Sequence, residues 1–81
     1  MAITITAFAP KGQAIHTTTV ATMGDARAYC YLNAIPEWVD GFSVEGIGIV
    51  RVRRNVNGTI RAFSRLRDGE FVEGTIEEMV N

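Results

Sequence analysis

Few residues of this chain have the types and spacing that enzyme chemistry requires. His16 and Cys30 are the only His and Cys, so they are the only pair from which a thiol nucleophile and an imidazole base would come. Cys30 falls in the middle of an expected helix, away from the helix N-terminus that lowers a thiol pKa. One histidine and one cysteine also cannot form a zinc site of the usual kind. We therefore expect a protein that is not an enzyme, with no catalytic residue, no metal site and no cofactor.

The acidic and glycine-rich motifs also suggest structural roles. Asp25 fits a helix-capping box that begins at Thr22, and Asp40-Gly41 fits a turn. The triplet 46–48, Gly-Ile-Gly, lies inside an expected strand and does not open a helix, so it lacks the context of a dinucleotide-binding loop. Glycines inside a strand often mark a close approach of backbone, and we expect the helix to lie close over this triplet.

The charges are segregated along the 81 residues, although the formal net charge is only −1. Residues 46–67 hold six arginines and no acid, and residues 68–81 hold five acids and no base. Within 61–67, Arg-Ala-Phe-Ser-Arg-Leu-Arg, an aromatic ring stands between arginines. On an open sheet face, aromatic rings can stack nucleic-acid bases while guanidinium groups hold phosphates. Arginine and aromatic residues are equally typical of protein–protein hot spots. A third interpretation is a solvent-exposed sheet face without a partner, on which arginine stems cover apolar surface.

Alternating β-branched residues and turn signals define the elements that would position these arginines. We expect a hairpin of 3–9 and 13–21, a helix over 23–34, and strands over 43–55, 59–67 and 70–74, with a second capping box at 75–78. The order ββαβββ predicts one α+β domain over 1–81, with an antiparallel sheet and one helix packed on one face.

The turn after the long strand decides which side chains share a face. A two-residue loop would place Val52 opposite Phe63 and mix arginines with aliphatic residues on both faces. A three-residue loop, 56–58, pairs Val52 with Ala62 and separates charge from core, so we expect that register. Phe71 then joins the core face. The expected partner-binding residues on the opposite face are Arg51, Arg53, Arg61, Phe63, Arg65 and Arg67.

These features predict a small cytoplasmic protein-binding module that modulates or inhibits a partner by covering a functional surface. The arginines favour a partner protein with an acidic surface; a nucleic-acid-binding module is the alternative, and no membrane partner is expected. Small residues at helical spacing, Ala26, Cys30 and Ala34, form one stripe of the helix, which we expect to lie close on the sheet. A second apolar stripe, roughly opposite, holds Ala28, Leu32 and Ile35 and, like a free strand edge, is a candidate homodimer interface. No motif specifies a family. In kind, the compact arginine-rich chain resembles the small accessory proteins of phages and mobile elements, such as anti-CRISPR and other anti-defence proteins.

Overall fold

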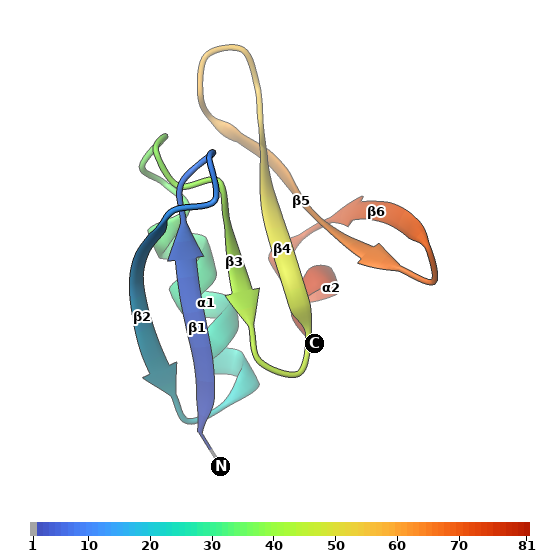
Figure 1. The fold of residues 1–81 in the computed structure, drawn as a ribbon. Coiled ribbons are helices and arrows are strands. Elements are labelled where there is room, and N and C mark those ends of the chain that lie inside the picture. Colours follow the sequence, from blue (N-terminus) through green and yellow to red (C-terminus); the bar gives the residue numbers. More distant parts are fainter. Residues whose placement is uncertain (1) are drawn as a thin grey trace.

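The computed structural model describes residues 2–81, which form an antiparallel sheet with helices on one side (Figure 1). The elements are β1 (Ile3–Phe8), β2 (Ala14–Val20), α1 (Met23–Asn33), β3 (Gly41–Val44), β4 (Gly48–Arg54), β5 (Ile60–Arg67), β6 (Glu70–Gly74) and α2 (Ile76–Met79). The strand order across the sheet is β2-β1-β3-β4-β5-β6. The predicted α+β class, element order and helix-covered antiparallel sheet are confirmed.

The strand expected over 43–55 is divided into β3 and β4 by a tight turn. Ile47 N donates to Val44 O at 2.9 Å, and Gly46 and Gly48 have φ angles of +82° and +109°. Residues with a Cβ rarely adopt such angles, which explains why glycine stands at both positions. A Cβ built on either glycine would meet nothing within 4 Å. The expectation that the helix lies close over these glycines is therefore wrong.

Helix α1 begins and packs as its sequence predicts. The Thr22 side chain accepts a hydrogen bond from Asp25 N at 3.1 Å, which satisfies a backbone donor in the first turn. The small residues Ala26, Cys30 and Ala34 recur at helical spacing and are completely buried. They let the helix approach the sheet closely, over Ile5 and its buried neighbours in the central strands.

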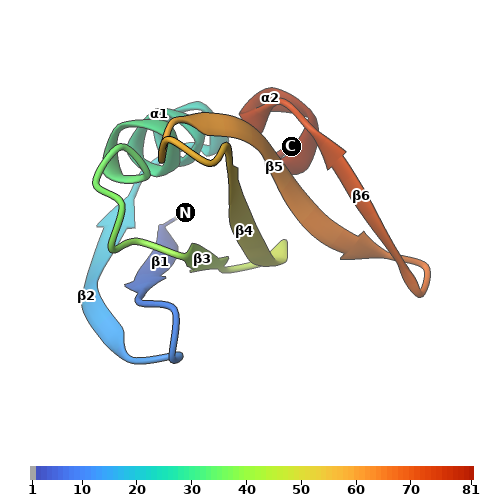
Figure 2. The same cartoon turned by 90° about the horizontal axis from the view of Figure 1, so that it is seen from above.

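The segment after β6 completes the core at the other half of the sheet. Thr75 and Glu78 form a reciprocal capping box, as the sequence predicts, and α2 then turns Ile76, Met79 and Val80 into the core. Figure 2 shows the sheet curling so that α1 and α2 lie side by side on its inner face. The opposite, outer face of the sheet carries no helix in the part of the chain that the structure describes (Figure 2).

The register of β4 and β5 differs from the predicted one because of a β-bulge. The three-residue turn is present, since Asn55 N donates to Thr59 O at 2.8 Å. Beyond the turn the register shifts, and Val52 lies opposite Phe63 rather than Ala62. The bulge leaves Arg61 as an extra residue on β5, and a shift of one residue moves every following side chain to the other face.

Candidate functional site

The predicted arginine face does not exist as one surface. Phe63, expected at its centre, is only 3% exposed and belongs to the core. Arg65 and Arg67 alternate with Ser64 and Leu66 along β5, so they share the inner, helix-bearing face with Phe63. Arg51 and Arg53 lie on the outer face, and Arg61 is the bulged residue between the two groups. The structure thus separates the six residues that the sequence grouped together.

The arginines on the outer side of the sheet have acceptors within the protein. Arg51 Nη1 donates to Asp40 Oδ2 at 2.8 Å, and Arg53 Nε donates to the hydroxyl of the buried Ser64 at 3.0 Å. Arg61 Nη1 donates to Glu73 Oε1 at 2.8 Å. The same Glu73 lies 4.0 Å from Arg53 Nε, so one carboxylate of the acidic segment serves two arginines of the basic one.

The ion pair between Arg61 and Glu73 shifts the pKa of both groups in the direction that favours their charged forms. The hydrogen bond from Arg61 lowers the pKa of Glu73, and the same contact raises the pKa of Arg61. Both groups are solvent-exposed, so the pair balances charge and contributes little to folding stability.

On the inner side, arginines hold the C-terminal segment against the sheet. Arg65 Nη1 donates to Met79 O at 2.9 Å, and Arg67 Nη2 donates to Glu78 O at 3.2 Å. Burial lowers the pKa of Arg65, as expected for a cation moved out of water. From α1, Arg27 Nη1 reaches Val80 O at 2.8 Å. These guanidinium groups satisfy main-chain carbonyls of α2 and the residues that follow it.

His16 and Cys30 do not have the properties of a catalytic pair. Cys30 is completely buried, and burial raises the pKa of its thiol to about 12. A thiol with that pKa is protonated at neutral pH and is a poor nucleophile. His16 lies close to the Tyr29 hydroxyl, with Nδ1 at 2.7 Å. Burial raises the pKa of the Tyr29 hydroxyl above its ordinary value.

The side of α1 that faces away from the sheet is apolar and exposed. Ala28 and Leu32 lie one turn apart on α1, and Ile35 follows directly after the C-cap Ala34. Leu32 and Ile35 are 63% and 59% exposed. Trp38, in the connection to β3, is itself 66% exposed. We refer to Ala28, Tyr31, Leu32, Ile35 and Trp38 as the α1 stripe. A surface helix usually carries polar residues on the side opposite its buried stripe, so exposed apolar residues on this side are unusual.

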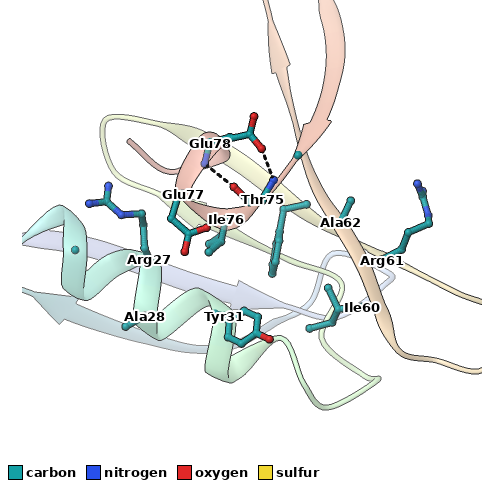
Figure 3. A pocket seen from close by; sticks show the side chains of 13 residues that line it. Arg27, Ala28, Tyr31, Ile60, Arg61, Ala62, Thr75, Ile76, Glu77 and Glu78 are labelled. Carbon is teal, nitrogen blue, oxygen red and sulfur yellow. Dashed lines mark hydrogen bonds between the residues drawn. The ribbon is translucent and has the colours of Figure 1, made fainter.

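The α1 stripe borders a cleft of about 840 Å³ between α1, β5 and α2 (Figure 3). Tyr31 from α1 and Ile60 from β5 face each other across it, and the Tyr31 ring lies 6.5 Å from that of Phe63. Glu77 extends from α2 toward α1, whereas Arg61 points away from the cleft (Figure 3). The cleft therefore combines apolar residues, among them Tyr31, Ile60 and Phe63, with the charged residues Arg27, Glu77 and Glu78. Its apolar part is suited to an apolar side chain.

A second apolar group lies on the outer face of the sheet. Ile49, Leu66 and Phe71 are 53%, 57% and 66% exposed and line one shallow hollow with Arg51. Phe71 was expected in the core. Its pairing with Leu66 is as predicted, but the bulge places both side chains on the outer face. That part of the prediction is wrong for the same reason as the arginine face.

The sequence predicts the exposed apolar residues of the α1 stripe, but it does not predict the cleft beside them. The spacing of Ala28, Leu32 and Ile35 marks a second apolar side of the helix. The cleft depends on where α2 docks, and the turn of helix at 75–78 predicts that α2 forms but not its place on the inner face. The bulge at Arg61, which a hydrophobic pattern does not reveal, decides what lines the other wall.

Comparison with known proteins gives no relative from which a function could be transferred: no family model, curated protein or solved structure matches the chain. Among residues 2–81, no group of three or more His, Cys, Asp or Glu side chains is placed to hold a metal ion. Neither α1 nor α2 has the length and apolar character that a helix needs to span a bilayer.

Proposed function

We propose that the protein is a small non-enzymatic binding module that modulates or inhibits a partner protein by covering one of its functional surfaces. The α1 stripe carries this proposal. Leu32 and Ile35 are both more than half exposed, and exposed groups of large apolar side chains are typical of interaction sites. Tyr31 and Trp38 add the large aromatic side chains that dominate binding hot spots.

The occupant that best fits this surface is an apolar helix or loop of a protein. The α1 stripe offers a ridge of aliphatic side chains, and the cleft beside it offers a hollow for one or two anchoring residues. This arrangement favours apolar complementarity over the acidic partner that the arginine pattern suggested. Charged side chains enter the cleft lining from α1 and α2, where Arg27, Glu77 and Glu78 stand.

Nucleic-acid binding has less support than protein binding. The arginines of 46–67 each have an acceptor inside the protein, in carboxylates, a hydroxyl or main-chain carbonyls. Engaging a phosphate would require several of these contacts to be exchanged. The net charge of −1 also gives no long-range attraction to a polyanion.

The proposal is tested with a pair of matched surface variants. Wild type, Leu32→Asp and Ile49→Asp are immobilised and exposed to lysate of the source cells, and retained proteins are quantified by mass spectrometry. Both substitutions place an aspartate at an exposed apolar site, one on the α1 stripe and one on the outer face. Circular dichroism and urea unfolding first establish that both variants fold.

The expected result is one protein that wild type and Ile49→Asp retain and Leu32→Asp loses. Titration of that purified protein should show an affinity loss of about 30-fold for Leu32→Asp, corresponding to a hot-spot residue worth about 2 kcal/mol. Equal retention by Leu32→Asp would overturn the assignment of the α1 stripe. Tight binding of short DNA or RNA that weakens steeply with salt would support the nucleic-acid alternative instead.

A further inference from the structure

The two edges of the sheet differ in how they are protected against pairing with another strand. β6 is five residues long and carries Glu70 and Glu73, and charged side chains discourage edge pairing. β2 is seven residues long and contains no charged residue, no glycine and no proline. Most of its residues are β-branched, which favours extended backbone. The β2 edge is therefore the one suited to accept a further strand.

Hydrogen bonds on the neighbouring strand show which backbone groups of β2 face outward. Thr4 O accepts from Glu45 N at 3.0 Å and Phe8 O accepts from Asp40 N at 2.9 Å, so these residues of β1 bond on the β3 side. The alternating residues of β1, including Ile5, then bond toward β2. Ile5 lies opposite Thr18. It follows that the N–H and C=O groups of Thr17 and Thr19 point away from the sheet.

A bulge limits the regular part of this edge. The register between β1 and β2 shifts between Ala7 and Phe8, which leaves Ile15 as an extra residue. Such a bulge bends an edge away from a neighbouring strand. The regular edge is therefore the segment 16–20, and its midpoint is Thr18.

We propose that the β2 edge pairs antiparallel with β2 of a second copy, across a twofold axis at Thr18. This register places Thr17 of one copy opposite Thr19 of the other, so their outward groups exchange main-chain hydrogen bonds on both sides of the axis. In a twofold contact the same strand of both copies forms the interface, so any charge on that strand meets a like charge from the other copy. An uncharged edge tolerates this arrangement, whereas the acidic β6 edge would bring like charges together.

The side chains around the axis are compatible with this pairing. On the inner face, Thr18 lies beside Thr18 of the second copy, and His16 lies opposite Val20. On the outer face, the threonines would extend a hydroxyl row that already exists, since Thr6 Oγ1 and Thr17 Oγ1 are 3.0 Å apart. The proposed contacts are made by β2, which contributes no residue to the α1 stripe, so this inference does not rest on the proposed function.

An engineered cysteine at the axis tests the register directly. In the proposed dimer, the two Thr18 residues form a non-hydrogen-bonded pair with Cα atoms about 4.5 Å apart, a spacing that a disulfide can bridge. Thr18→Cys should form a covalent dimer on mild oxidation, whereas Thr4→Cys, an exposed position on β1, should not. The native thiol at Cys30 is buried and does not compete. Equal cross-linking of both variants would overturn the register.

The oligomeric state provides a second measurement that needs no cross-link. Light scattering should find a concentration-dependent dimer for wild type. Thr17→Pro should be monomeric and folded, because it removes an N–H that has no partner within one chain. Thr17→Val keeps that N–H and should remain dimeric. If Thr17→Pro fails to fold, Thr17→Lys serves in its place, since an edge lysine blocks pairing. A wild-type monomer at every concentration would overturn the proposal.

Discussion

Arg54 ties the end of α1 to the β4–β5 hairpin, and replacing it should cost more stability than replacing any exposed arginine of the same strand. Its Nη2 lies 2.6, 2.8 and 2.9 Å from the carbonyl oxygens of Ala34, Pro36 and Val39, and Nη1 lies 3.2 Å from that of Gly58. The last turn of α1 contains no basic residue. Arg54 therefore supplies, from another element, the positive charge that a helix C-terminus favours.

The size of the effect follows from the donor count. Nη2 has two hydrogens for three carbonyl oxygens, so its contacts share donors and do not add independently. A hydrogen bond to a charged group contributes about 1.5–3 kcal/mol. With two such bonds and partial solvent exposure, we expect Arg54→Ala to lower the free energy of unfolding by about 3 kcal/mol. In a domain of this size that corresponds to a fall in Tm of about 12–24 °C.

Urea and thermal unfolding of three variants would check this value. Arg54→Lys keeps the charge but loses the planar fork, and should recover about half of the loss. Arg51→Ala is the matched control, because its ion pair with Asp40 is 44% exposed on the arginine side and should contribute about 0–1 kcal/mol. A loss for Arg54→Ala no larger than that for Arg51→Ala would refute the role of these carbonyl contacts.

Three further predictions follow from burial and ion pairing. Phe63→Ala should destabilise the protein by about 3–5 kcal/mol in urea unfolding, because it empties a core position; a change below 1 kcal/mol would place the ring at the surface. The Cys30 thiol, whose pKa burial raises to about 12, should react with a thiol reagent at pH 8 only after unfolding, and immediate labelling of the native protein would contradict its burial. Because Arg61 lowers the pKa of Glu73 below its ordinary value of 4.5, the pair stabilises the fold above that pH and is lost as the pH falls through the lower, folded-state value. Stability of Glu73→Gln should therefore depend less on pH below 4.5 than that of wild type, as measured by unfolding across an acid series.

Local signals predicted most of the elements. The caps at Thr22 and Thr75 rest on hydrogen bonds within four residues, so the sequence alone contains both partners. The small-residue stripe through Cys30 predicted the buried side of α1 for the same reason. The structure differs from the prediction at 46–48 because glycine serves both a close backbone approach and a positive φ angle, and the sequence pattern does not distinguish the two.

The sequence pattern could not predict which arginines share a face, because the single bulged residue Arg61 decides it. A hydrophobic pattern assigns faces by strict alternation, and the bulge at Arg61 interrupts that alternation in β5. The expected separation of charge from core favoured the wrong register, since the energetic cost of inward-pointing arginines appeared high. In the structure Arg65 offsets part of that cost by donating from Nη1 to Met79 O, an acceptor on α2 whose position no local signal gives, while its Nε is buried without an acceptor.

The bulge at Arg61 also makes the end of the β4–β5 hairpin a natural place for length variation. In a regular hairpin, a change in loop length shifts the register and reverses the faces of a strand. Here the bulge takes up one extra residue on β5 between the tip and Phe63, so the Val52–Phe63 pair is kept although the two strands differ in length. Val56 and Asn57 at the tip are exposed to solvent. An epitope or a second binding loop grafted between them should therefore be carried without repacking the interior.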